Sequence, residues 1–328
     1  MLSRRDFVAG ASLATLVGGI RPGAAQAYPS QTIRILAGLP AGGGIDLLAR
    51  ILAEPLKALG QSVVVENRTG AAGMIAAQAT AKAPPDGHVM LMATSGEIAI
   101  SHHLYKEKMT YDPMRELAPV ALAGIVPCVV VVAETTPVKT PQELIAYAKA
   151  NPKKLSFSSS GVGNPQQLAG ELMNSMAGTD VLHVPYRGAA PAVTDVATGA
   201  VTMSFTSYAA ALPLIQAGKL RAVAVTSLER MPQLPDVAPL QEGAPGLKGY
   251  ELLNWFGVFA PGGTPAPIVA RLNEITVKTF TDAAMVQKLA VQGIMPRATT
   301  PAQFKAFVEA ESKKFAGIIE RANIKAPN

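Results

Sequence analysis

Cysteine, histidine and aromatic residues are scarce in this sequence. Only one of its 328 residues is cysteine, four are histidine, and 5% are aromatic. The single cysteine, Cys128, excludes an internal disulfide, and its place in the apolar run 126–132 favours a small buried core residue over a nucleophile. The four histidines lack the spacing of metal ligands, and we expect neither a metal nor a cofactor. These histidines are His88, His102, His103 and His183.

Charged residues are also few, at 16% of the chain, and the net charge is only +6. Lysines and arginines are scattered, with no run of four and no interleaved aromatic residues, which argues against a nucleic-acid partner. After the N-terminal segment, proline, glycine or a charge interrupts every apolar run before it is long enough to cross a bilayer. We therefore expect a soluble mature protein.

Residues 1–27 have the pattern of an export signal. Arg4 and Arg5 precede the uncharged stretch 7–20, and the small residues of 25–27 form a cleavage site. The paired arginines indicate the twin-arginine route, with a periplasmic protein that begins at Tyr28. A short N-terminal anchor helix is the alternative. Removing the segment also removes three arginines and one aspartate, so a net charge of +4 remains.

The rest of the chain repeats one pattern of strands and helices. Apolar residues with helical spacing alternate with short β-branched runs, which predicts two βαβαβ units with parallel strands. The first unit comprises strand 33–37, loop 38–44, helix 45–59, strand 62–66, a helix after 68–72, and strand 89–93. The second comprises strand 155–158, loop 159–164, helix 165–176, strand 181–185, a helix after 187–190, and strand 201–205.

Two such units predict an α/β fold of two doubly wound lobes joined by crossing strands. We expect lobe 1 at 28–125, completed by about 255–328, and lobe 2 at 126–254. The apolar segments 120–133, 220–226 and 255–260 are the expected crossings between lobes. Further helices are expected at 209–217, 266–280 and 301–321.

Each unit has a glycine-rich loop between its first strand and helix, at 40–44 and 158–164. Ligands of open α/β sheets bind at this edge, where free N–H groups and the helix dipole attract anions. We expect the two loops to hold one carboxylate between them, although a tight strand-to-helix connection is the simpler explanation of either loop. Asp46 is expected to orient its own helix start rather than act as a base.

Nucleotide and enzyme motifs are missing. The first loop lacks the Lys-Ser/Thr pair of a P-loop, and the second has Gln166 where a dinucleotide fold needs a third glycine. There is no Gly-x-Ser-x-Gly elbow. A hydrolase that uses Ser159 or Ser160 stays open, because His183 of the same lobe could act as its base.

Several motifs together resemble the Bug family, the periplasmic solute receptors of tripartite tricarboxylate transporters, over residues 28–325. The motifs are the segments 28–29, 40–46, 64–68, 85–87, 104–106, 168–172, 183–192, 234–237 and 256–265. The resemblance implies a type II periplasmic-binding-protein architecture that closes on a carboxylate, and a partnership with integral-membrane transporter subunits. We expect a monomer. A ligand sensor, or an orphan receptor not coupled to transport, is the alternative.

The resemblance also implies ligand contacts from both lobes. Those of lobe 1 would be Ala41, Gly42, Gly43, Asp46, Thr94 and Ser95. Those of lobe 2 would be Ser159, Ser160, Gly161, Asn164, Gln166, Tyr186, Gly188 and Ser207. The chain departs from the family pattern at Ile45, Met74 and Thr206, which each replace a more polar residue. We therefore expect a less polar ligand, such as an aromatic or branched monocarboxylate.

Overall fold

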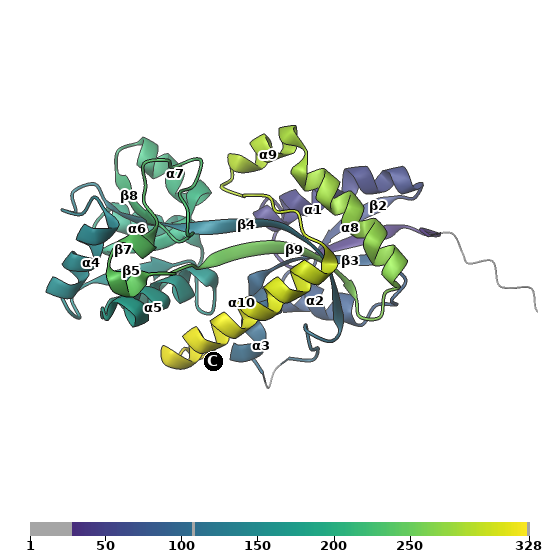
Figure 1. Cartoon of the computed structure of the whole chain (residues 1–328), viewed down its shortest axis with the longest axis horizontal. Helices are drawn as coiled ribbons and strands as arrows, with labels where there is room; N and C mark the ends of the chain where they lie inside the picture. Colours follow the sequence, from purple (N-terminus) through teal and green to yellow (C-terminus); the bar gives the residue numbers. More distant parts are fainter. Residues whose placement is uncertain (1–27, 107–108, 327–328) are drawn as a thin grey trace, which may run out of the picture.

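The computed structural model describes residues 28–106 and 109–326 of the chain. Two lobes lie side by side along the long axis and are joined by two long strands (Figure 1). The predicted signal peptide, 1–27, lies outside the described residues. Across the described part, none of the helices is both long enough and apolar enough to span a bilayer.

The first lobe begins with the expected βαβαβ unit. Its elements are β1 (Ile33–Ala37), α1 (Gly44–Leu56), β2 (Val63–Asn67), α2 (Met74–Ala81) and β3 (Val89–Thr94). β1 pairs in parallel with both β2 and β3, so it lies between them. After β3 come η3 (Gly96–Ile100), a π-helical turn, and α3 (Ser101–Leu104), neither of which the sequence pattern predicts.

The second lobe repeats this arrangement. Its unit consists of β5 (Ser156–Ser159), α5 (Pro165–Ala177), β6 (Leu182–Pro185), α6 (Ala189–Ala197) and β7 (Met203–Ser207). Again the first strand of the unit is central, because β5 pairs in parallel with β6 and β7. The unit is flanked by α4 (Pro141–Ala150), α7 (Tyr208–Gln216) and β8 (Leu220–Val225).

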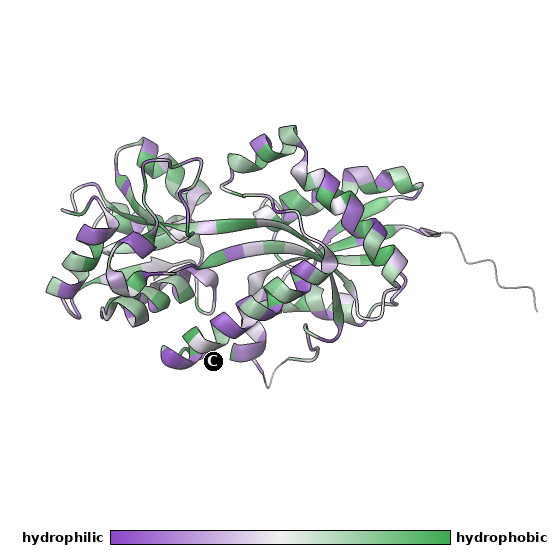
Figure 2. Cartoon of the chain, in the orientation of Figure 1, coloured by the Kyte–Doolittle hydropathy of each residue, from purple (hydrophilic) through white to green (hydrophobic). Residues whose placement is uncertain are grey.

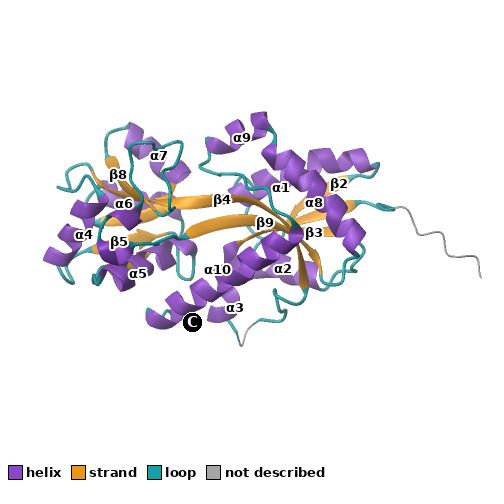
Figure 3. Cartoon of the chain, in the orientation of Figure 1, coloured by secondary structure: helices purple, strands orange, loops and turns teal. Residues whose placement is uncertain are grey.

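Two antiparallel strands connect the lobes, β4 (Leu117–Ala133) and β9 (Leu253–Pro261) (Figure 3). Residues 117–127 of β4 pair with β9, and β9 also pairs with β3. Residues 128–133 of β4 pair with β7 and β8 of the second lobe. One strand therefore belongs to the sheets of both lobes.

The expectation that 220–226 also crosses between the lobes is wrong. β8 pairs with the second-lobe half of β4. At about 3.3 Å per residue its six residues extend only about 20 Å, whereas the 17 residues of β4 are long enough to serve both sheets.

Three helices complete the chain, and they return to the first lobe as the sequence predicts. They are α8 (Ala266–Thr281), α9 (Ala283–Ala290) and α10 (Pro301–Arg321). α8 packs against α1 and β4, while α10 lies across η3 and β4 and reaches α5 of the second lobe (Figure 1). Thr300 and Gln303 form a capping box at the start of α10.

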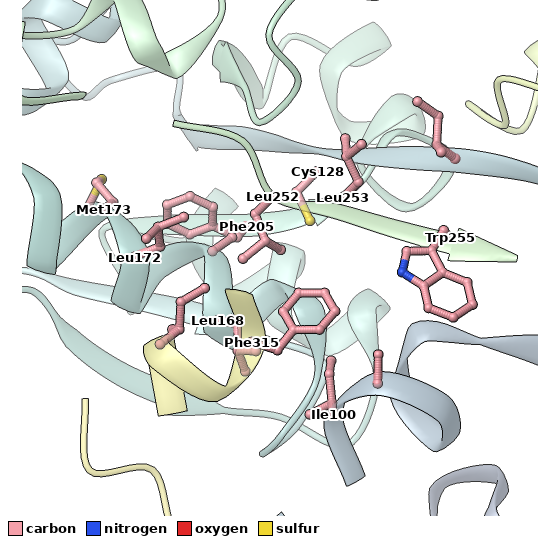
Figure 4. Close-up of a cluster of buried hydrophobic side chains, with 14 of the residues drawn as sticks. Ile100, Cys128, Leu168, Leu172, Met173, Phe205, Leu252, Leu253, Trp255 and Phe315 are labelled. Carbon is pink, nitrogen blue, oxygen red and sulfur yellow. The ribbon is translucent and has the colours of Figure 1, made fainter. Parts of the chain in front are cut away.

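The core is continuous across the junction of the lobes. The strands carry many hydrophobic residues, and the helices carry both hydrophobic and hydrophilic ones (Figure 2). Near the junction Phe205 of β7, Trp255 of β9 and Phe315 of α10 belong to one cluster (Figure 4). Cys128 lies in the same cluster, and burial raises the pKa of its thiol to about 12, which confirms the expected core role.

Gly257 provides a test of how tightly α10 packs on β9. A Cβ added at Gly257 would overlap the ring of Phe304 on α10, so Gly257→Ala is expected to lower the free energy of unfolding by about 1–3 kcal/mol. Gly317 lies on α10, where an added Cβ would contact only the flexible end of Arg321. Gly317→Ala should therefore leave the free energy of unfolding equal or higher. Urea denaturation of both variants checks this, and an unchanged midpoint for Gly257→Ala would contradict it.

Candidate functional site

A cleft of about 360 Å³ lies where loops of both lobes meet the crossing strands. Its walls are Leu39, Ala72, Thr94 and Gly96 of the first lobe, residues 160–166 and Ser207 of the second, and Val126, Pro127, Cys128 and Asn254 of β4 and β9. A larger groove, of about 820 Å³, is lined by α1, α8, α9 and their connections, all of the first lobe. The smaller cleft is the better candidate because elements of both lobes converge on it.

None of the residues that line this cleft carries a charged side chain. Polar groups come from the amides of Asn164, Gln166 and Asn254 and from the hydroxyls of Thr94, Ser160 and Ser207. α5 begins at the cleft with its positive dipole end. Such a site can hold one anionic group with neutral donors, and the rest of the lining suits an apolar body.

Six of the fourteen predicted contact residues line the cleft: Thr94, Ser160, Gly161, Asn164, Gln166 and Ser207. The other eight lie outside its lining: Ala41, Gly42, Gly43, Asp46, Ser95, Ser159, Tyr186 and Gly188. The three departures from the family pattern, Ile45, Met74 and Thr206, are not part of the lining either. The absence of charged groups from these walls, rather than those three positions, is the structural argument for a weakly polar ligand.

Asp46 organises the first glycine loop. Its Oδ2 accepts hydrogen bonds from the N–H of Gly42 and from Nε of Arg50, both at 3.0 Å. The bond from Arg50, assisted by that from Gly42, keeps the pKa of Asp46 below its ordinary value. The carboxylate is therefore ionised and orients the helix start, as expected from the sequence, and it occupies one N–H of the proposed cradle.

In the second loop, side chains of α5 and its cap already bind three backbone N–H groups. Gln166 Oε1 accepts from Ser160 N–H, and Gln167 Oε1 accepts from Gly163 N–H, both at 2.7 Å. Asn164 caps the helix by accepting from Gln167 N–H. These bonds reduce the number of backbone N–H groups that this loop can offer a ligand. Because Oε1 of Gln166 is the atom that accepts from Ser160, the Nε2 group of Gln166 remains as a donor at the cleft.

Ser159 and His183 are in contact beneath the second loop. Ser159 Oγ lies 2.7 Å from both His183 Nε2 and the carbonyl oxygen of Gly161. A carbonyl can only accept, so the hydroxyl donates to Gly161 and the imidazole donates to Ser159. Burial lowers the pKa of His183 to about 4, which keeps the ring neutral near pH 7. The pair fixes the shape of the loop.

Asn254 is a cleft residue that sequence reasoning missed. Its Oδ1 accepts from Ser95 Oγ at 2.8 Å and from Trp255 N–H at 3.0 Å. Because a backbone N–H can only donate, the amide orientation is fixed, and the NH₂ group remains a donor at the cleft floor. The only sequence signal was a polar residue within the apolar segment 252–260.

Glu97 of η3 is a second missed residue, directly behind Thr94 in the cleft wall. It is fully buried, and it accepts from Thr94 N–H at 2.9 Å and from Thr94 Oγ1 at 2.5 Å. Burial raises its pKa to about 7. Between pH 4.5 and 7 the folded state therefore holds a proton that the unfolded state releases, and the associated stability is lost as the pH rises through about 7.

Glu97→Gln removes this equilibrium. As the pH rises from 4.5 to 8.5, the wild type is expected to lose about 3 kcal/mol of its free energy of unfolding through Glu97. Glu97→Gln should not show this loss. The exposed Glu309, replaced by Gln, should keep the wild-type slope. Urea denaturation across this pH range measures all three proteins, and identical slopes for Glu97→Gln and the wild type would contradict the assignment.

Curated relatives match the chain over nearly its whole length. A protein from the tcbD-tcbE intergenic region of Pseudomonas sp. strain P51 is 37% identical over 99% of this chain and 96% of its own. Protein BugT of Bordetella pertussis is 34% identical over 99% of each chain.

Solved structures give the same result. Rpa4515 of R. palustris with adipate superposes with a TM-score of 0.78 at 34% identity, covering 91% of this chain and 99% of that one. MatC of Rhodopseudomonas palustris with malate superposes with a TM-score of 0.73 at 29% identity, covering 89% of this chain and 100% of that one. Residues 48–324 match the family described as tripartite tricarboxylate transporter family receptor. The chain therefore belongs to this family of solute-binding receptors, whose two-lobe α/β architecture it shares.

Proposed function

We propose that the protein is a periplasmic receptor that captures a small organic monocarboxylate in the interlobe cleft and delivers it, as a monomer, to the membrane subunits of a tripartite tricarboxylate-type transporter. The observation that carries the proposal is the convergence of both lobes on one uncharged cleft with amide donors. The solved relatives hold adipate and malate, both dicarboxylates, which supports a carboxylate ligand, while the restriction to one carboxylate comes from the lining of this cleft.

Neutral donors are sufficient for useful affinity. A hydrogen bond to a charged group contributes about 1.5–3 kcal/mol. The cleft offers donors from Gln166, Asn254 and a serine hydroxyl, together with the α5 dipole and apolar contact. Their sum must also offset the cost of association. Micromolar binding requires a net of about −8 kcal/mol, which such a set can supply.

Closure would occur about β4 and β9. We expect the moving bodies to be the predicted lobes, 28–125 with about 255–328 against 126–254; β4 changes partner from β9 to β7 and β8 after residue 127, two residues beyond the first of these boundaries. A ligand that bridges the lobes would shift the population toward the closed form, which the membrane subunits would recognise. Closure would also bring the exposed loop residues Ala41, Gly42 and Gly43 toward the ligand.

Catalysis is the alternative that a contact in the structure raises, because Ser159 and His183 resemble a nucleophile and its base. Ser159 is fully buried and outside the cleft lining, and its proton is directed to Gly161. These features favour a loop-fixing role and a receptor without turnover. A sensor that reports to a membrane kinase would use the same cleft, and the genes beside this one would distinguish it.

Asn254→Asp tests the site directly. The aspartate keeps an oxygen for Ser95 and Trp255 but replaces the NH₂ donor with a negative oxygen. Affinity for a monocarboxylate, found with a panel of organic acids, is expected to fall at least about 100-fold. Isothermal titration measures it, with the exposed Gln292→Glu as a control of equal charge change. Wild-type affinity in Asn254→Asp would remove this cleft as the binding site.

The export proposal gives a separate prediction. The periplasmic protein should begin at Tyr28, and replacing Arg4 and Arg5 by Lys should leave the precursor in the cytoplasm. Intact-mass measurement of fractionated protein checks both results. A periplasmic protein that retains residues 1–27 would show that the segment is an anchor.

A further inference from the structure

Glu97 places a carboxylate, with no ion-pair partner among the described residues, directly behind a polar group of the cleft wall. We propose that Glu97 is a positioning residue that makes the Thr94 hydroxyl a hydrogen-bond acceptor toward the ligand, so that the cleft selects monocarboxylates and rejects a second carboxylate at that wall. This inference rests on the proposed function and names the ligand class of the same cleft.

The hydrogen bonds of Thr94 leave no donor for a ligand. Its N–H donates to Glu97 Oε1, and its hydroxyl proton goes to Oε2. One lone pair of Thr94 Oγ1 accepts from Gly96 N–H at 3.0 Å. A hydroxyl has one proton and two acceptor positions, so a single lone pair remains for the cleft. A ligand group beside Thr94 gains a bond only if it donates.

The surroundings prevent Glu97 from releasing Thr94. Tyr111 donates its hydroxyl to the Glu97 carbonyl at 2.8 Å, and burial, assisted by the charge of Glu97, raises the pKa of Tyr111 so that it stays neutral. A Cβ on Gly73 would lie 2.9 Å from Glu97 Cδ, so the turn carrying Gly73 packs directly on the carboxyl group. Glu97 has no exposed surface, so bulk water does not reach its carboxyl group.

The same arrangement orients the ligand. Donors lie on the second-lobe wall, in the amide of Gln166 and at the start of α5, whereas the Asn254 amide is bonded to Ser95, the neighbour of Thr94. A ligand carboxylate held by these second-lobe donors would leave the far end of the ligand toward the first-lobe wall that carries Thr94. A hydroxyl at that end gains a hydrogen bond, a methyl group is tolerated, and a carboxylate meets a bare acceptor backed by a negative charge.

Two series of matched probes test this selection. The first series is hexanoate, 6-hydroxyhexanoate and adipate, which have six carbons and differ only at the far end. The second series is benzoate, 4-hydroxybenzoate and terephthalate, which have another shape. At pH 8.5, where the raised pKa of about 7 leaves Glu97 ionised, the wild type is expected to prefer 6-hydroxyhexanoate over adipate by at least tenfold in isothermal titration.

Glu97→Gln reverses the polarity of the hydroxyl. The glutamine oxygen keeps the bond from Thr94 N–H, and its NH₂ donates to Thr94 Oγ1, which frees the hydroxyl proton for the ligand. The preference over adipate should fall by at least tenfold. Thr94→Ser keeps the hydroxyl and should keep the wild-type preference. In a Thr94→Val background, Glu97→Gln should change the ratio of the affinities for 6-hydroxyhexanoate and adipate by less than about threefold.

Three outcomes separate the possibilities, once thermal unfolding has shown that each variant is folded. Wild-type protein that binds adipate or terephthalate as tightly as its hydroxy analogue overturns the selection by Thr94. If Glu97→Gln still changes the affinity ratio by tenfold or more in the Thr94→Val background, the positioning role is overturned, and Glu97 acts only through its charge. Failure of the wild type to bind any carboxylate of either series overturns the proposed function itself, and this inference with it.

Discussion

The pairing of β4 with β9 is the interaction on which the rest of the molecule depends. Nine residues of β4 between 117 and 127 pair with β9, with register shifts at Val120 and Ala123, and the next six residues join the sheet of the other lobe. One strand thus pairs with the sheets of both lobes. The cleft floor is made of these strands, so Asn254 and Cys128 contribute to the site although neither belongs to a glycine loop.

The chemistry of the cleft follows from which donors the fold uses internally. Glutamines and an asparagine at the start of α5 bind the N–H groups of their own loop, and Asp46 binds one in the first loop. These bonds give the loops fixed shapes before a ligand arrives. What the cleft offers a ligand is therefore the start of α5 and a small set of side-chain amides and hydroxyls, with no charged group in its lining.

Periodicity in the sequence predicted elements that depend on local pattern. The strand 33–37 and the helix 301–321 were predicted with the ends that the structure has, and both βαβαβ units are present. Neither α4 nor α9 was predicted, and the crossing assigned to 220–226 was wrong, because strand partners depend on contacts far apart in the chain. Asn254 and Glu97 were missed for the same reason: their roles arise only when β9 and η3 meet the cleft.

The central claim is that both lobes and the two shared strands hold one carboxylate between them. A crystal structure of the protein with a monocarboxylate tests it most directly. The account predicts the carboxylate within hydrogen-bond distance of Asn254 Nδ2 and of the second-lobe loop, with the loop at 41–43 closer to that loop than in the structure described here. A ligand bound instead in the groove between α1 and α8, or in a cleft whose lobes had not moved, would contradict it.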